Sequence, residues 1–379
     1  MSPVRPSAAA TPLRHHIPIA APSTRERATG DEPYLRVSLG FTPRWYHRRV
    51  GVDLGERWHL DPEYRYETIM EMKAYLHEAF PTMPYFESDP GPTGADLGAA
   101  TISGVYGILT VPMLYGLEPV YRPDNWPDVN PGSHLTKDEI SRLPAPDPAS
   151  APHIAALLEQ MEWIEWKAGL VPGYLNYQGV LNIALKVRGN EIFMDMYDDP
   201  EWAKRFLRHI GESMALTAEL VQSRQEDSGF RSAVFTVSNC VMNMVSPEQY
   251  EAFLLPVDRE LSARFPTFGV HTCNWDATPY LEKLRTIEPM GYLDMGPMSD
   301  LSRAKALFPA TRRSVLYGPV DLENKTEAEI AADLERIADA YGPCDVALAD
   351  VEDTTPDDRV RYFLAAAAEI SDRRELDGA

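Results

Sequence analysis

The sequence predicts an α/β protein that folds as a single (β/α)8, or TIM, barrel. Short apolar runs typical of buried parallel strands alternate with amphipathic helical patterns through the C-terminal two-thirds of the chain. Repeats of this kind imply parallel strands joined by right-handed crossovers, and about eight such units fit the length of the chain. No dinucleotide-binding glycine motif or P-loop follows a strand, so an open nucleotide-binding sheet is not supported.

The strand predictions rest on runs of four to seven residues that are mostly apolar, without the alternation expected of a sheet with one wet face. These runs lie at residues 36–41, 173–177, 233–237, 268–271, 292–295, 314–317 and 345–349. Because the side chains of such strands are apolar on both faces, we expect helices outside the sheet and a packed interior within it.

The helix predictions rest on apolar spacing together with start and stop signals. Helical patterns cover residues 154–168, 200–225 and 326–341, and a further helix begins at Ser246-Pro247-Glu248. Asp199 precedes Pro200 as a side chain able to cap a helix whose first residue is proline. The last pattern stops at Gly342-Pro343, a typical helix end.

The first thirty residues are rich in Pro, Ala, Ser, Thr and Arg and lack the apolar stretch of an export signal. We therefore expect a disordered tail over residues 1–31 and one barrel domain over residues 32–379, with a helical extension near its N-terminus. The Pro- and Asp-rich stretches 119–131 and 143–152 are interpreted as excursions from the barrel.

The charge balance excludes some classes of partner. The chain has 379 residues, with 36 Lys and Arg against 57 Asp and Glu, a formal net charge of −21. Nucleic acids and anionic membranes require a basic face, so neither is expected as a partner. Three cysteines are too few for a disulfide framework and favour a reducing cytoplasm. Residues 97–117 are uncharged, but they are too often interrupted by Gly, Pro, Ser and Thr for a membrane helix.

The barrel prediction also indicates where chemistry would occur, because functional groups lie at the C-terminal ends of barrel strands. The candidates at these ends are Asn239, Cys240, His271, Thr272, Cys273, Asp294, Asp321, Asp350, Glu352 and Asp353. Cys344 instead precedes its strand, so we expect it at the opposite end of the barrel.

His271 and Cys273 form the sharpest local signal. At positions i and i+2, where a strand opens into a loop, an imidazole and a thiolate can point at a common centre. Both are zinc ligands, and a catalytic zinc site needs only three protein ligands and one open position. Cys240, Glu352 and Asp350 are candidates for the third ligand. The alternative interpretation is a structural histidine beside a buried, inert cysteine.

Two other groups are candidates for binding a substrate. Arg48 follows the first predicted strand, where a guanidinium can hold a carboxylate, although the sequence alone favours a surface pairing with Asp53 or Glu56. Polar and aromatic residues also flank Gly179 and can line a pocket, or belong to the core with their polar groups satisfied. They are Tyr174, Asn176, Tyr177 and Asn182.

Taken in order, several short motifs resemble those of the uroporphyrinogen decarboxylase superfamily, which is built on a (β/α)8 barrel. The matching residues are Pro43, Trp45, Tyr46, Arg48 and Gly51; Gly179, Gly189 and Asp199-Pro200-Glu201; Ser246-Pro247-Glu248 and Leu255-Pro256; His271-x-Cys273; Gly318-Pro-Val-Asp321; and Thr355-Pro356. The resemblance runs from about residue 35 to the C-terminus.

The resemblance implies one of two chemistries. Decarboxylases of the superfamily use arginines from the first motif, with an Asp and a Tyr, and no metal. Here Arg48 matches the first arginine, but Val52 stands at the second, and residues 110–116 contain no acid. These departures argue against decarboxylation of a substrate with many carboxylates, and the metal-free carboxy-lyase remains an alternative.

The other branch resembles methyltransferases that bind zinc through His-x-Cys and a later Cys, and exchange a methyl group between a small molecule or thiol and a corrinoid. His271 and Cys273 fit this motif, whereas residues 349–353 lack the later cysteine, so Cys240 or Glu352 is the expected third ligand. No Asp-x-His-x-x-Gly sequence is present, so a corrinoid would arrive free or on a partner protein. A third alternative is a barrel that binds a corrinoid or tetrapyrrole without catalysis.

We assign expected roles on this basis. The candidate catalytic residues are Arg48, Tyr177, Asn239 and Asp321, and the candidate substrate contacts are Trp45, Tyr174, Asn176, Asn182 and Asp294.

Overall fold

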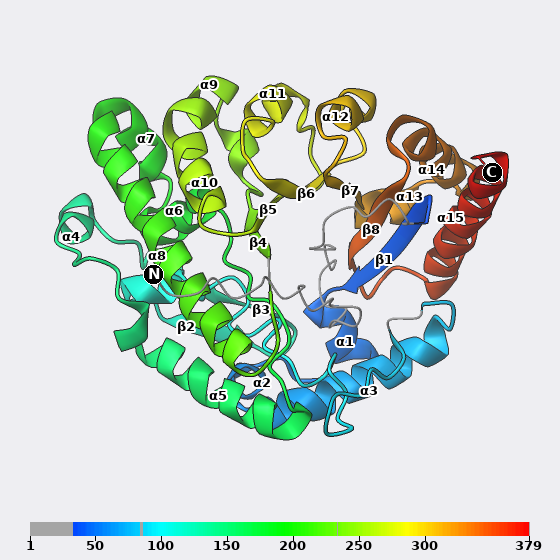
Figure 1. The fold of residues 1–379 in the computed structure, drawn as a ribbon, viewed down its shortest axis with the longest axis horizontal. Coiled ribbons are helices and arrows are strands. Elements are labelled where there is room, and N and C mark those ends of the chain that lie inside the picture. Colours follow the sequence, from blue (N-terminus) through cyan, green and yellow to red (C-terminus); the bar gives the residue numbers. More distant parts are fainter. Residues whose placement is uncertain (1–32, 84–85, 233, 379) are drawn as a thin grey trace, which may run out of the picture.

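Six parallel strands form one curved sheet in the order β1-β8-β7-β6-β5-β4 (Figure 1). The computed structural model describes residues 33–83, 86–232 and 234–378, so the predicted tail 1–31 lies outside the described residues. The strands are β1 (Leu35–Phe41), β4 (Val234–Ser238), β5 (Thr267–His271), β6 (Met290–Met295), β7 (Arg312–Tyr317) and β8 (Cys344–Val351). The first strand lies beside the last, as in a barrel, which confirms the predicted fold class.

One predicted strand is absent. Residues 173–177 lie in an extended but irregular segment beside β4, where the Ser238 hydroxyl donates to Asn176 Oδ1 at 3.3 Å. On the other side of the segment, the Ile102 amide donates to the Pro172 carbonyl at 3.1 Å. Gly173, with φ 118°, departs from the extended backbone of a regular ladder. The wall between β4 and β1 is therefore completed by irregular chain.

Helices surround the strands (Figure 1). The predicted helices are observed as α5 (Pro152–Ala168), α8 (Pro200–Asp227), α9 (Pro247–Gln249) with α10 (Leu255–Ser262), and α14 (Glu327–Tyr341). The others are α1 (Pro43–Arg49), α2 (Glu56–Leu60), α3 (Pro62–Ala79), α4 (Lys137–Ser141), α6 (Val180–Arg188), α7 (Glu191–Asp198), α11 (Leu281–Leu284), α12 (Leu301–Leu307), α13 (Pro319–Asn324) and α15 (Asp357–Gly378).

The predicted helix starts form as expected. The Asp199 side chain accepts from the Trp202 amide at 3.2 Å, and Pro200 is the first residue of α8. Ser246 and Gln249 form a reciprocal capping box at the start of α9. The predicted excursion 119–131 contains a small antiparallel hairpin, β2 (Pro119–Arg122) and β3 (Asn125–Val129).

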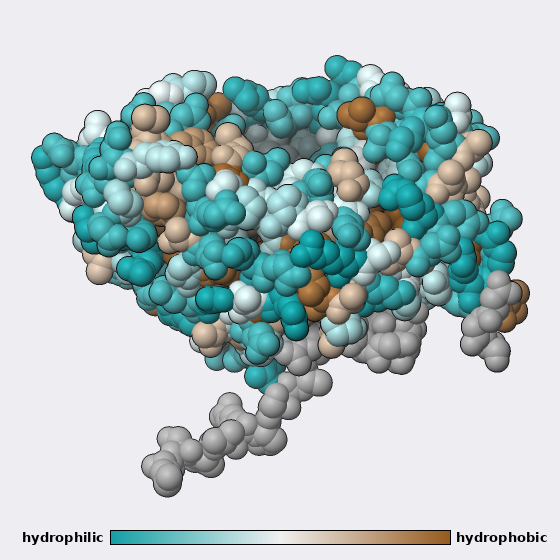
Figure 2. All heavy atoms as spheres, turned by 90° about the horizontal axis from the view of Figure 1, so that it is seen from above, coloured by the Kyte–Doolittle hydropathy of each residue, from teal (hydrophilic) through white to brown (hydrophobic). Residues whose placement is uncertain are grey.

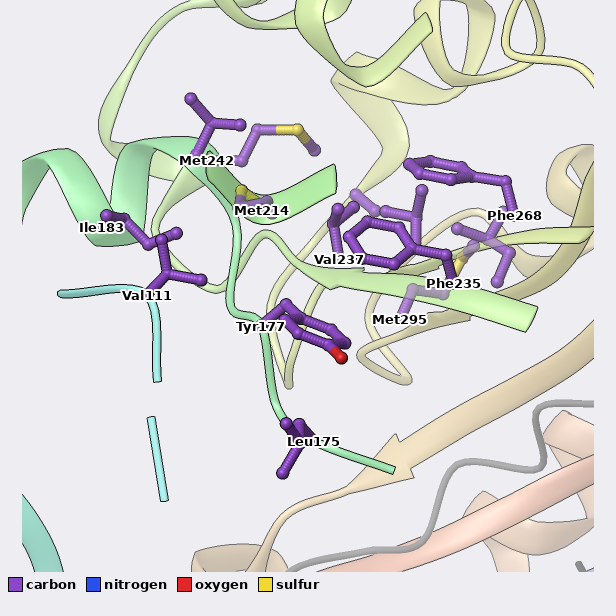
Figure 3. Close-up of a cluster of buried hydrophobic side chains, with 14 of the residues drawn as sticks. Val111, Leu175, Tyr177, Ile183, Met214, Phe235, Val237, Met242, Phe268 and Met295 are labelled. Carbon is purple, nitrogen blue, oxygen red and sulfur yellow. The ribbon is translucent and has the colours of Figure 1, made fainter. Parts of the chain in front are cut away.

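The core fills the space inside the sheet and between the sheet and the helices. Figure 3 shows part of it, where Phe235 and Val237 from β4 lie among Phe268, Met295 and other apolar side chains. The rings of Phe235 and Phe265 stack with centroids 4.4 Å apart. Hydrophilic side chains cover most of the face in Figure 2. Among the described residues, we find no helix long and apolar enough to span a membrane.

Candidate metal centre at the mouth of the barrel

Three side chains converge at the C-terminal ends of β4 and β5. Cys240 lies two residues beyond β4, His271 is the last residue of β5, and Cys273 follows two residues later. One donor atom from each lies within 4.8 Å of the other two. No other group of three such side chains in the described part of the chain meets this limit. The sulfur and nitrogen donors therefore lie where a barrel places its functional groups.

Pairing between the two strands sets the position of Cys240 beside His271. Ser238 is the register partner of His271, and the Asn239 amide continues the ladder by donating to the His271 carbonyl at 2.7 Å. Cys273 reaches the same centre because its backbone takes a left-handed conformation, with φ 62°. Such a backbone is unusual for a residue with a side chain and is found at functional turns.

The imidazole of His271 is fixed by a hydrogen bond between its Nδ1 atom and a buried carboxylate. Its Nδ1 lies 2.7 Å from Asp294 Oδ2, and its Nε2 lies 3.0 Å from Cys273 Sγ. Asp294 is fully buried, and it also accepts from the Thr272 amide and the Tyr292 hydroxyl, each at 2.8 Å. A carboxylate at Nδ1 fixes the proton on that nitrogen, so Nε2 is left to face the sulfur atoms.

The electrostatics of the cluster favour an anionic sulfur. A hydrogen bond from Cys273 lowers the pKa of Cys240 well below its usual value, and burial opposes this effect less strongly. The hydrogen bond to Cys240, together with burial, raises the pKa of Cys273. Burial disfavours the charged form of His271, but Asp294 and the two sulfur atoms raise its pKa well above its usual value. Within the cluster, Cys240 is therefore the sulfur whose thiolate form the neighbouring groups favour.

The three donors fit zinc. Zinc binds thiolate at about 2.3 Å and imidazole at about 2.0–2.1 Å, so donors of a tetrahedral site lie roughly 3.5–3.8 Å apart. In this structure His271 Nε2 lies 3.0 Å from Cys273 Sγ, and no two of the three donor atoms are more than 4.8 Å apart. The separation that zinc requires lies between these two distances. Asp294 supplies the outer carboxylate that metal-binding histidines usually have.

The other candidate ligands lie outside this cluster. Glu352 accepts from the Thr42 hydroxyl at 3.3 Å, and Asp350 is exposed at the end of β8 with φ 52°. Neither belongs to the group within 4.8 Å, whereas Cys240 does. Cys344 is the first residue of β8 and is buried at the opposite end, as expected from its place before the strand.

Several expected catalytic or substrate residues do not face an open surface. Trp45 is 0% exposed and packs against the ring of Phe41 at 4.3 Å. Tyr177 is 6% exposed and stacks on Phe235 within the core of Figure 3. Asp294 is buried behind His271. All three side chains are buried where they stand, and their expected roles in catalysis or substrate binding stay predictions.

The remaining candidates are engaged with protein groups. Arg48 forms an ion pair with Asp353, and not with the expected Asp53 or Glu56, and its side chain is 60% exposed. Asp321 lies in the first turn of α13, 3.4 Å from Lys325. Asn239 is buried, and its amide donates to Asp258 at 3.1 Å.

The polar residues around Gly179 form a local network. Asn176 Oδ1 accepts from the Gln178 amide at 3.0 Å, and Asn182 Nδ2 donates to Gln178 Oε1, also at 3.0 Å. The Tyr174 amide donates to the Ser103 hydroxyl at 3.1 Å. These contacts hold the irregular wall segment in place, and a role of these residues in binding substrate stays a prediction.

Two residues that contact the loop carrying Cys240 were missed in the sequence. The Trp275 indole donates to the Cys240 carbonyl at 3.0 Å, and Asp258 is buried in α10. The sequence contains a signal that could have identified Asp258, because this acid lies at helical spacing from Leu255 and Leu261, with which it shares the buried face of α10. An acid on an apolar helical face indicates a buried polar contact.

The comparisons with known proteins identify the family of the chain. The family model described as uroporphyrinogen decarboxylase (URO-D) matches residues 96–346, a range that includes all three donors. The chain belongs to the uroporphyrinogen decarboxylase family. No protein of curated function matches the sequence.

Two solved structures can be compared with this member of the uroporphyrinogen decarboxylase family. A methyltransferase from Methanosarcina mazei is 15% identical, the match covers 89% of this chain and 94% of that one, and the TM-score is 0.63. A B12-independent methionine synthase from Shewanella sp. W3-18-1 is 11% identical over 59% of this chain and 68% of that one, with a TM-score of 0.40. At these identities, the first comparison establishes a shared fold.

Proposed function

We propose that this member of the uroporphyrinogen decarboxylase family is a zinc-dependent methyltransferase, which moves a methyl group between a small-molecule substrate or thiol and a corrinoid. The observation that carries the proposal is the cluster of Cys240, His271 and Cys273 at the barrel mouth, with Asp294 behind the imidazole. The shared fold of the M. mazei methyltransferase supports it.

The ligand set leaves one coordination position for a substrate. Cys240 Sγ, His271 Nε2 and Cys273 Sγ would hold zinc, which when bound lowers the pKa of a coordinated substrate thiol and keeps it as the nucleophilic thiolate. A catalytic zinc site has this composition of three protein ligands and one open position, whereas a structural site uses four.

The surrounding residues of the chain prepare the site for this chemistry. Asp294 holds the Nδ1 proton of His271 and fixes the plane of the ring. The Thr272 amide and the Tyr292 hydroxyl hold the carboxylate in turn. On its other side, Cys273 packs against Leu316, Ala347 and Ala349. These apolar side chains exclude water from that side of the Cys273 sulfur.

In the transfer itself, the substrate thiolate forms a new bond from sulfur to the methyl carbon. The bond between that carbon and the donor breaks, and its electron pair stays on the donor; for a methyl-corrinoid, this leaves cob(I)alamin. Transfer to the corrinoid forms a bond from cob(I)alamin cobalt to the methyl carbon of an O- or N-methyl donor. The bond from that carbon to oxygen or nitrogen breaks, and the leaving oxygen or nitrogen keeps the electron pair and takes a proton from water. No proton is required at the carbon, so the absence of an acid in residues 110–116 does not hinder the reaction.

The alternative of a metal-free carboxy-lyase is less well supported. It needs cationic groups that are free to bind carboxylates, but Arg48 is paired with Asp353 and Val52 stands at the second arginine position. A paired guanidinium must give up its partner before it binds a substrate carboxylate, which weakens that binding.

An anaerobic assay tests the proposal. Protein purified without chelator is mixed with methylcobalamin and a set of thiols, and the visible absorbance of the corrinoid is followed. We expect zinc-dependent demethylation that is lost in Cys273→Ser and retained in Cys344→Ser. Turnover of carboxylated substrates that is lost in Arg48→Ala, with no demethylation, would instead establish the lyase. A shift in cobalamin absorbance without turnover would establish a binding barrel.

A further inference from the structure

A buried carboxyl group lies behind the loop that carries Cys240. Asp258, in α10, is 1% exposed, and its Oδ2 accepts from Asn239 Nδ2 at 3.1 Å and from the Tyr250 hydroxyl at 2.8 Å. Asn239 directly precedes Cys240 in the chain. A hydrogen bond to Asp258 therefore restrains the residue from which Cys240 projects.

An irregularity before α10 brings Tyr250 and Asp258 together. Tyr250–Leu254 forms a π-helical turn between α9 and α10. Eight residues of regular α-helix would place Tyr250 and Asp258 roughly 80° apart around the axis, whereas the extra residue of a π-turn reduces this angle to about 20°. The π-turn thus aligns the hydroxyl with the carboxyl group, and turns of this kind recur at functional sites.

A second contact holds Cys240 from its carbonyl side. The Trp275 indole donates to the Cys240 carbonyl at 3.0 Å. The Trp275 ring meets Tyr280 edge-on with centroids 5.6 Å apart, and Tyr280 meets Tyr250 edge-on at 5.9 Å. The contacts therefore form a closed ring that leads from Asp258 through Asn239, Cys240, Trp275, Tyr280 and Tyr250 back to Asp258.

The centre needs such support at Cys240 more than at its other two donors. His271 and Cys273 belong to one short segment, and Asp294 anchors it through the His271 ring and the Thr272 amide. Cys240 comes from a different strand and an irregular loop, so its distance from the other two donors depends on that loop. Metal–ligand distances must be met within about 0.2 Å, and a loose loop weakens binding.

The surroundings of Asp258 favour its neutral, protonated form. Its Oδ1 is buried and has no hydrogen-bond partner among the described residues. A buried carboxylate with a bare oxygen is costly, whereas a neutral acid can carry its proton there. Burial raises the pKa of Asp258 to about 6, in the same direction.

We propose that Asp258 is a positioning residue, which acts through Asn239 to hold the Cys240 sulfur in the metal centre, with Trp275 as the second anchor on the Cys240 carbonyl. The proposal rests on the proposed zinc site. According to this proposal, the buried face of α10 contributes to metal affinity as well as to packing.

Two measurements on the full-length protein test the proposal. The first is zinc affinity, by competition with a chelating dye. The second uses metal-free protein and phenylarsine oxide, which condenses with two neighbouring thiols and releases water, so that its affinity reports the spacing of Cys240 and Cys273. The variants are Asp258→Leu and the conservative Asp258→Asn. Ser262→Ala is the matched control, because this buried hydroxyl of α10 donates to the Arg259 and Glu288 carbonyls and not toward Cys240.

We expect Asp258→Leu to weaken both zinc and arsenical binding about 10- to 100-fold, the usual effect of losing an outer-shell contact. Asp258→Asn, which keeps an acceptor for Asn239, should stay within about threefold of wild type, as should Ser262→Ala.

If Asp258→Leu does not fold, Asn239→Ala and Trp275→Phe test the two anchors separately, and each should weaken arsenical binding. Unchanged binding of both probes in the folded variants would overturn the proposal. Wild-type protein that binds the arsenical but no zinc would refute the zinc site alone, and the arsenical series would still decide the role of Asp258.

Discussion

The Nδ1 atom of His271 lies 2.7 Å from Oδ2 of Asp294, and that carboxylate is fully buried. A buried carboxylate on Nδ1 fixes the orientation of the ring and directs Nε2 at the sulfur atoms, so Nε2 is the nitrogen through which the neutral ring would bind a metal. The pairing also explains why an acid at the end of a barrel strand is withheld from the mouth. Asp294 contacts the histidine, and its expected contact with a substrate stays a prediction.

Asp294→Asn should weaken zinc binding about 10- to 100-fold, because the amide offers one acceptor in place of two and turns a donor toward one of its three partners. Competition with a chelating dye measures the loss. Asp321→Asn is the matched control, since this acid lies in α13 and pairs with Lys325. Equal affinities for Asp294→Asn and wild type would contradict the role given to the carboxylate.

Cys240 and Cys344 should differ sharply as zinc ligands. Cys240 belongs to the three-donor cluster, whereas Cys344 is buried at the far end of the barrel, where burial raises its pKa to about 12. We expect Cys240→Ser to lower the zinc content of purified protein well below one equivalent and Cys344→Ser to leave it unchanged, as measured by elemental analysis. Full zinc content in folded Cys240→Ser would remove Cys240 from the site.

Arg48→Ala should have little effect on stability or methyl transfer. The guanidinium is 60% exposed and pairs with Asp353, and exposed ion pairs contribute at most about 1 kcal/mol. Urea unfolding and the corrinoid assay measure the two effects. A large loss of turnover with unchanged zinc content would instead point to a substrate carboxylate bound by Arg48.

Asp258→Asn should change how stability depends on pH. The pKa of Asp258 is about 6 in the folded protein against an ordinary 3.8, so the folded state binds this proton more tightly than the unfolded state. The resulting stabilisation is present below about pH 4 and is lost as the pH rises through 6; two pKa units correspond to about 3 kcal/mol. Relative to wild type, the variant should therefore gain about 2 kcal/mol between pH 4 and pH 7 in urea unfolding. A constant difference between the two proteins would show that Asp258 does not titrate in this range.

The sequence was most informative where local pattern decides the structure. Strands β7 and β8 are recognisable because each contains a short run of apolar residues that is buried on both faces, residues 315–317 in β7 and residues 346–349 in β8. The caps at Asp199 and Ser246 depend only on neighbouring residues. The convergence of His271 and Cys273 was also predictable, since the two are separated by a single residue at the end of a strand.

Features that depend on the orientation of side chains in the folded protein, or on contacts between distant segments, could not be predicted from local pattern. Residues 173–177 have a strand-like composition, but Gly173 and Gln178 take positive φ values that break a regular ladder. Trp45 and Tyr177 match motifs or lie near them, yet packing turns both rings into the core. The link from Asp258 to Asn239 joins residues 19 apart in the chain, and only the folded arrangement of β4 and α10 reveals it.

The central claim is that Cys240, His271 and Cys273 bind one zinc ion. Crystals of protein purified without chelator, measured on both sides of the zinc absorption edge, test this claim most directly. We expect a single strong anomalous peak that lies within bonding distance of Cys240 Sγ, His271 Nε2 and Cys273 Sγ. A well-ordered structure with no zinc peak among these three atoms would contradict the account.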